Sequence, residues 1–166
     1  MKTSVMILAL ALLALAATSR ACADGGGGGD ESRAARGDSA DPDYTTAVKA
    51  IDAGRFAEAI PLLEGVVARD GRNADAYNWL GYAVRRSGDP TRAIPIYQKA
   101  LDIDPKHRGA HEYIGEAYLI LGDVASARRH LKRLDSLCFL PCSEYRDLKK
   151  AIETFEKTGK APTASR

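Results

Sequence analysis

Aromatic residues are scarce in this chain, and long apolar runs are nearly absent. Aromatic side chains account for 7% of the 166 residues, with a single Trp, whereas hydrophobic residues account for 45%. No segment gives the alternating apolar and polar signal of a half-buried strand. The composition therefore predicts one small all-α domain of Ala- and Leu-rich helices.

An excess of charge of one sign is also lacking. The formal net charge is +2, and Lys2 and Arg20 are the only charged residues among residues 1–23. Without those two, the 24 bases become 22, which balance 22 acids. No basic run is interleaved with aromatic residues. This balance argues against electrostatic capture of nucleic acid or of an anionic membrane.

Motifs that would carry catalysis are missing too. The sequence has no glycine-rich phosphate loop, no nucleophile elbow and no supported pair of catalytic carboxylates. His107 and His111 are four residues apart, a spacing that zinc ligands use, but no H-E-x-x-H motif accompanies them. His111 falls on a core position, so we expect it packed and His107 exposed. The sequence predicts no enzyme, no catalytic residue, no cofactor and no metal site.

The one long apolar run lies near the start of the chain. Lys2 precedes an apolar run over residues 5–17, and Ala21 and Ala23 follow it. This layout is typical of a secretory signal peptide, which predicts residues 1–23 as the signal and an exported, periplasmic protein. In the alternative interpretation Cys22 is lipidated and anchors the chain to the envelope membrane. Residues 24–42, with five consecutive glycines, are predicted to form a flexible tether.

Cysteine is rare, and only two of the 3 cysteines lie beyond residue 23. Cys138 and Cys142 flank a predicted turn, and in an oxidising periplasm such a pair is most simply a structural disulfide. The alternative is a redox-active pair. Thioredoxin-type enzymes, however, separate their cysteines by two residues beside a βαβ unit, whereas three residues intervene here and no sheet is expected.

A period of 34 residues organises the rest of the chain. Two sets of small residues recur at this spacing, Gly54, Gly88 and Gly122, and Ala59, Ala93 and Ala127. Such a period predicts a solenoid of stacked units. The central segment, residues 73–105 (NADAYNWLGYAVRRSGDPTRAIPIYQKALDIDP), resembles a tetratricopeptide repeat (TPR), which implies a helix-turn-helix unit whose first helix (A) packs against its second (B).

The resemblance implies three TPR repeats over residues 43–142 and a short right-handed α-solenoid. The predicted A/B pairs are Asp43–Ala53 with Phe56–Arg69, Ala74–Ser87 with Pro90–Ile103, and Arg108–Leu121 with Val124–Leu137. Each A/B junction carries a glycine suited to positive φ, and Asp89 and Asp123 can cap the B helices after them. A capping helix is predicted over residues 143–157, and a disordered tail over 158–166. The first A helix is poorly apolar, so its start is expected to fray.

The resemblance also implies that the A helices line a concave groove in which a partner protein or peptide binds. The residues expected there are Tyr44, Val48, Asn78, Trp79, Tyr82, Arg85, Arg86, Glu112, Glu116 and Leu119. Because acids and bases face each other across this groove, a partner segment with both signs of charge and an apolar anchor fits better than a terminal carboxylate.

These expectations lead to one main hypothesis and two alternatives. The main one is a non-enzymatic scaffold that mediates protein–protein interaction in the bacterial periplasm or envelope. The first alternative is an accessory in periplasmic thiol or cytochrome maturation that uses Cys138 and Cys142. The second is self-association through the groove or the capping helix.

Overall fold

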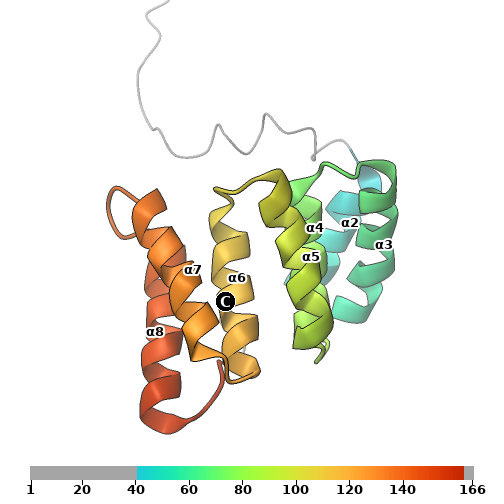
Figure 1. The fold of residues 1–166 in the computed structure, drawn as a ribbon. Helices are drawn as coiled ribbons and strands as arrows, with labels where there is room; N and C mark the ends of the chain where they lie inside the picture. Colours follow the sequence, from blue (N-terminus) through green and yellow to red (C-terminus); the bar gives the residue numbers. More distant parts are fainter. Residues whose placement is uncertain (1–40, 163–166) are drawn as a thin grey trace, which may run out of the picture.

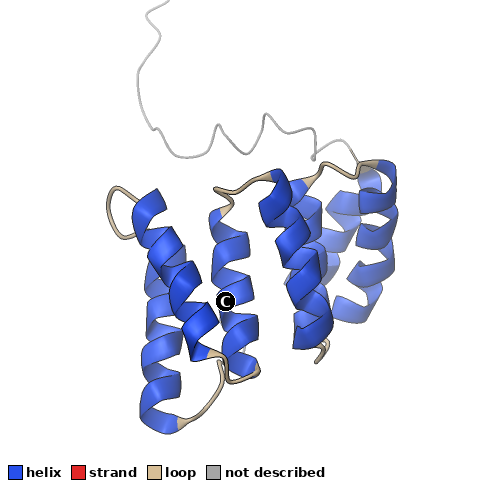
Figure 2. Cartoon of the chain, viewed as in Figure 1, coloured by secondary structure: helices blue, strands red, loops and turns tan. Residues whose placement is uncertain are grey.

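The computed structural model describes residues 41–162. The predicted signal peptide, Cys22, nearly all of the predicted tether and the last four residues of the tail lie outside the described residues. Within the described part the chain is helical and has no strand (Figures 1 and 2). Its elements are α2 (Pro42–Asp52), α3 (Phe56–Arg69), α4 (Ala74–Arg86), α5 (Pro90–Ile103), α6 (Arg108–Ile120), α7 (Val124–Leu137) and α8 (Ser143–Thr158). The expected helices are confirmed to within a residue or two at each end.

Three antiparallel hairpins, α2/α3, α4/α5 and α6/α7, stack side by side, and α8 packs on α6 and α7 at the far end (Figure 1). Among the A helices, α2 touches α4 and α4 touches α6, and α6 also touches α8. The B helices α3, α5 and α7 make at most marginal contact with one another. The stack therefore curves toward the A helices, and α8 occupies the place of a fourth A helix. This is the expected all-α solenoid.

The turns inside the hairpins confirm the role of the recurring glycines. Gly54, Gly88 and Gly122 have φ of 73°, 98° and 79°, backbone conformations that residues with a Cβ atom rarely adopt. The Asp89 carboxylate then accepts the Arg92 backbone N–H at 2.9 Å, which caps α5. The spacing of these residues therefore predicts how each A helix ends and how α5 and α7 begin, whereas α3 begins after Arg55 without a side-chain cap.

Two further glycines allow helices to approach closely. A Cβ placed on Gly81 would lie 2.7 Å from the Tyr97 ring, and one placed on Gly115 would lie 2.6 Å from a Leu148 methyl carbon. The first contact closes the α4/α5 hairpin. The second was not foreseen, because it is α8 that fills the space above α6. The predicted cap is therefore packed into the core, where Leu148 is fully buried.

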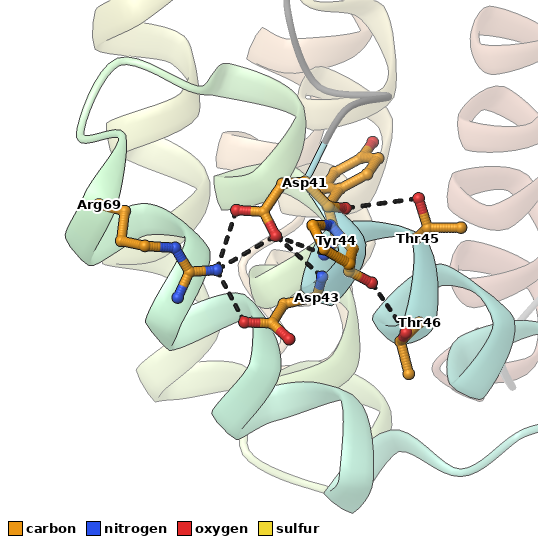
Figure 3. A network of polar contacts seen from close by, with 7 residues as sticks. Asp41, Asp43, Tyr44, Thr45, Thr46 and Arg69 are labelled. Atoms are coloured by element: carbon orange, nitrogen blue, oxygen red, sulfur yellow. Dashed lines mark hydrogen bonds and ion pairs between the residues drawn. The ribbon is translucent and has the colours of Figure 1, made fainter.

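The start of α2 is held by a polar network in place of apolar contacts (Figure 3). The Asp41 carboxylate accepts the Asp43 backbone N–H at 2.8 Å, and Arg69 of α3 donates to Asp41 at 2.9 Å and to Asp43 at 2.8 Å. Hydrogen bonding to Arg69 lowers the pKa of Asp41 below its usual value. Asp41 and Pro42, assigned to the tether from the sequence, therefore belong to the folded domain. Thr46, on the same helix, is exposed and donates to the Pro42 carbonyl.

Candidate partner-binding face

The ten residues expected in the groove lie on the A helices, but most of them are not open to solvent. Arg86, Tyr44 and Val48 are half-buried. The other seven are buried, namely Asn78, Trp79, Tyr82, Arg85, Glu112, Glu116 and Leu119. These seven side chains therefore form the floor beneath any binding surface on this face. That a partner binds on this face stays a prediction.

The opposed charges of the expected groove meet each other across two helices. Arg85 of α4 and Glu116 of α6 form an ion pair with 2.8 Å between Nη2 and Oε2, and their side chains are 1% and 0% exposed. The contact satisfies the distance of a hydrogen bond but not its angles, so attraction between the charges holds it. Arg85 also donates from Nε to the Tyr97 hydroxyl at 3.3 Å. A buried ion pair of this kind links the second repeat to the third.

Glu112 lies one helical turn before Glu116 and has no cation of its own. Burial, together with the nearby carboxylates of Glu116, Asp147 and Glu144, raises the pKa of Glu112 to about 8. The side chain is therefore mostly protonated at neutral pH. The floor of the face thus combines one paired carboxylate with one neutral carboxylic acid. The Asn78 Oδ1 atom of α4, also on this face, is buried without a hydrogen-bond partner among the described residues.

Aromatic rings close the end of the face near the first repeat. Tyr82 packs edge-on against Phe56 and Trp79, with ring centroids 6.0 and 5.7 Å away, and Tyr113 lies at 4.9 Å. Arg86 covers this group: its guanidinium lies 4.4 Å above the Phe56 ring and donates to the Tyr82 hydroxyl at 2.6 Å. Solvent reaches Arg86, Phe56 and Tyr113 in part, whereas Tyr82 and Trp79 are buried. Phe56 and Tyr113 were not among the expected residues, because they lie on α3 and at a different angle on α6.

The three histidines have local structural roles. His107 caps α6 by accepting the Ala110 backbone N–H at its Nδ1 atom, so its Nε2 atom carries the proton that faces Asp75 at 2.9 Å. The expectation that His107 is exposed is therefore wrong, because only 10% of its side chain is exposed. His111 is packed, as expected. In the described residues no group of three or more His, Cys, Asp or Glu side chains is arranged to hold a metal ion.

His111 and His130 join α6 to α7 through their rings. His111 Nε2 lies 3.1 Å from the Pro105 carbonyl, to which it must donate, so its Nδ1 atom accepts from His130 Nδ1 at 3.0 Å. Burial lowers the pKa of both rings, that of His130 to about 4. Both rings are therefore neutral at pH 7, as this hydrogen-bond chain requires.

The Cys138–Cys142 turn joins α7 to α8. The two Sγ atoms are at bonding distance, and the two Cα atoms lie 5.8 Å apart. Phe139 and Leu140, between them, point into solvent. None of the helices in the described range is both long and apolar enough to span a membrane.

Two family models named "Tetratricopeptide repeat" match this chain, one over residues 44–108 and one over 84–152. Among curated proteins, the chain is 34% identical over 82 residues to the probable biofilm formation methyltransferase WspC of Pseudomonas aeruginosa, covering 49% of this chain and 19% of that protein. It is 30% identical over 105 residues to the TPR repeat-containing thioredoxin TTL4 of Arabidopsis thaliana, covering 63% and 14%. The chain thus spans a fifth or less of these relatives' lengths.

Solved structures share the fold. MamA from Desulfovibrio magneticus RS-1 superposes with a TM-score of 0.56 at 28% identity, covering 57% of this chain and 54% of that one. PcrH, solved in complex with the chaperone binding region of PopD, superposes with a TM-score of 0.63 at 17% identity, covering 71% and 91%. The two family matches together cover α2 through most of α8, and the repeat landmarks form the hairpins described above. The chain belongs to the tetratricopeptide repeat family.

Proposed function

We propose that this protein is a non-enzymatic TPR scaffold of the bacterial periplasm or envelope, and that it binds a segment of a partner protein on its A-helix face. The observation that carries the proposal is that Tyr44, Val48 and Arg86 are half-buried and remain within reach of a partner. These side chains lie on α2 and α4, on the face that the TPR resemblance assigns to partners. The Arg86 guanidinium lies over a cluster of aromatic rings. Aromatic and Arg side chains are the types that dominate protein–protein interfaces.

The fold supports this choice of ligand class. PcrH, whose chain has the same fold, was solved with a region of PopD bound. In the present chain, α4 has no exposed residue, whereas α2 exposes several, including Thr45 and Lys49. A partner segment would therefore lie across α2 and the end of α4, and the buried Arg85–Glu116 pair would serve as a rigid support below it.

Export rests on residues 1–23, and the relatives do not bear on it. A chain carrying a periplasmic reporter at its C-terminus tests it: the proposal requires reporter activity that is lost when residues 1–23 are removed. Mass analysis of the exported chain then decides between a first residue of Asp24 and a lipidated Cys22.

Site-specific photo-crosslinking tests the partner-binding face. A photoreactive phenylalanine at Tyr44 should crosslink to a partner in envelope extract, and the same group at Lys99, exposed on α5, is the matched control on the opposite layer. Arg86→Glu should abolish the Tyr44 crosslink, while Lys99→Glu should leave it intact. Equal crosslinking from both positions, or none from Tyr44, would refute the assignment of the binding face.

The second candidate function, an accessory role in thiol or cytochrome maturation, depends on the chemistry of the cysteine pair. The bonding distance between the Cys138 and Cys142 sulfur atoms, in a turn that solvent reaches, favours a disulfide there. We propose that the bridge is structural and fixes the entry of α8. Thiol titration before and after mild reduction, with the reduction potential of the pair, distinguishes this from thiol chemistry: a potential in the range of catalytic dithiols would favour the accessory role in thiol or cytochrome maturation.

A further inference from the structure

The turn between α7 and α8 carries the most exposed large apolar side chains of the described residues. Phe139 is 101% exposed and Leu140 is 73% exposed, against 47% for Leu121 and 36% for Ile120 at the α6–α7 junction. Figure 1 shows the α7–α8 turn as a loop that projects from the C-terminal end of the stack. A single exposed apolar residue needs no explanation, but two adjacent ones on a projecting turn mark a contact surface.

The turn holds these side chains outward at little cost in entropy. Cys138 and Cys142 bracket it with sulfur atoms at bonding distance, and Pro141 restricts it further. A closed turn of this length cannot fold back to bury Phe139 against the helices. Its contact surface is thus already formed before binding, which lowers the entropy lost on association.

Basic side chains outnumber acidic ones along the parts of α7 and α8 that flank the turn, although the whole chain is nearly neutral. Residues 131–150 contain five exposed bases, Lys132, Arg133, Arg146, Lys149 and Lys150, and three acids, Asp135, Glu144 and Asp147. Of the acids, Glu144 lies 3.7 Å from a further base, Arg108 of α6. Residues 131–150 therefore carry two more bases than acids, an excess that the overall charge balance concealed.

We propose that the Phe139–Leu140 turn inserts into the surface of an anionic lipid bilayer, with the bases around it on the lipid headgroups. A projecting convex tip requires a medium that closes around it, and the bilayer interface accepts apolar side chains without a complementary pocket. Each Lys or Arg near an anionic leaflet adds to the attraction. This contact is separate from the partner-binding face and does not use Cys22, so it stands or falls independently of the proposed function.

Vesicle binding tests the proposal with a chain that starts at Asp24. This chain lacks the apolar run and Cys22 but keeps every residue of the packed core, which lies between residues 47 and 152. We expect it to co-sediment with vesicles of phosphatidylcholine and phosphatidylglycerol, and to bind phosphatidylcholine alone at least tenfold more weakly. Phe139→Ser with Leu140→Ser should reduce binding to the anionic vesicles at least tenfold.

The matched control is Ile120→Ser with Leu121→Ser, which removes the exposed apolar pair at the α6–α7 junction and should leave binding unchanged. A direct readout of insertion is Phe139→Trp: the introduced indole should shift its emission to the blue on anionic vesicles, above the constant signal of the single buried native Trp79. Unchanged emission, no binding by the parent chain, or equal loss in both double variants would overturn the proposal. A Phe139-dependent dimer without vesicle binding would also overturn it, in favour of a second copy as the occupant.

Discussion

Replacing Glu112 by Gln should change the pH dependence of stability in a defined way. Glu112 is buried on α6, and its pKa is raised to about 8 by burial and by the carboxylates of Glu116, Asp147 and Glu144. At neutral pH the folded protein therefore holds this side chain as a neutral acid. Gln has nearly the same shape and cannot ionise, so Glu112→Gln mimics the protonated state at every pH.

The sign and size of the effect come from linkage. Because the folded pKa lies above the usual 4.5, the folded state keeps a proton that the unfolded chain releases, so the stabilisation is complete below pH 4.5 and is lost as the pH rises to about 8. The loss is about 1.4 kcal/mol per pH unit within that window. Relative to the parent chain, Glu112→Gln should therefore gain about 2 kcal/mol in unfolding free energy between roughly pH 5.5 and 7.

Urea unfolding followed by circular dichroism at several pH values measures this difference, and other titrating groups cancel between the two chains. The control is Glu116→Gln, the same change one helical turn away. It leaves the buried Arg85 charge without its partner, so it should cost about 3 kcal/mol. If the difference between Glu112→Gln and the parent stays constant from about pH 5.5 to 7, the carboxyl has an ordinary pKa and the reasoning about its burial fails.

Three further changes test other parts of the fold. Gly81→Ala should lower the unfolding free energy by about 1–3 kcal/mol, because the added methyl group collides with the Tyr97 ring. Gly65→Ala, whose methyl group meets only the end of the flexible Arg69 side chain, should instead stabilise α3 by about 0.5–1 kcal/mol. Thermal unfolding of both variants gives the comparison. Cys138→Ser with Cys142→Ser should lower the unfolding free energy by about 2 kcal/mol in oxidising buffer, and reduction of the parent chain should reproduce that loss. His130 has a pKa lowered to about 4, so its contribution to stability is present above pH 6.5 and is lost as the pH falls toward 4; His130→Phe should flatten this acid limb in urea titrations, and an unchanged slope would contradict the neutral ring pair.

The repeat made much of the fold predictable from sequence. A residue such as Gly88 has a local requirement, positive φ at the end of a helix, that the sequence states by itself. Helix positions with the same spacing then place Leu80 and Ala93 in the core without knowledge of anything outside the hairpin. Features that depend on one hairpin alone could therefore be predicted.

The accessibility of the A-helix face could not be predicted in the same way, because it depends on the neighbouring hairpin. The repeat positions of Arg85 and Glu116 indicated correctly that the two side chains face each other. They did not indicate whether a side chain at such a position contacts a partner or the neighbouring helix. Leu148 is a similar case. Its burial against Gly115 depends on how α8 docks on α6, and the pattern of α8 showed only that one face of it was apolar.

The enclosure of each A helix depends on its number of neighbours, and this reverses the expectation about the first repeat. Among the described helices, α4 and α6 each lie between two A-type helices, whereas α2 has one such neighbour and keeps several exposed side chains. The apolar weakness of α2, which predicted fraying, is offset by the contacts of Asp41 and Asp43 with Arg69. A helix that is anchored at its start by ion pairs and left open along its side is suited to receive a partner segment, so recognition is expected at the first repeat.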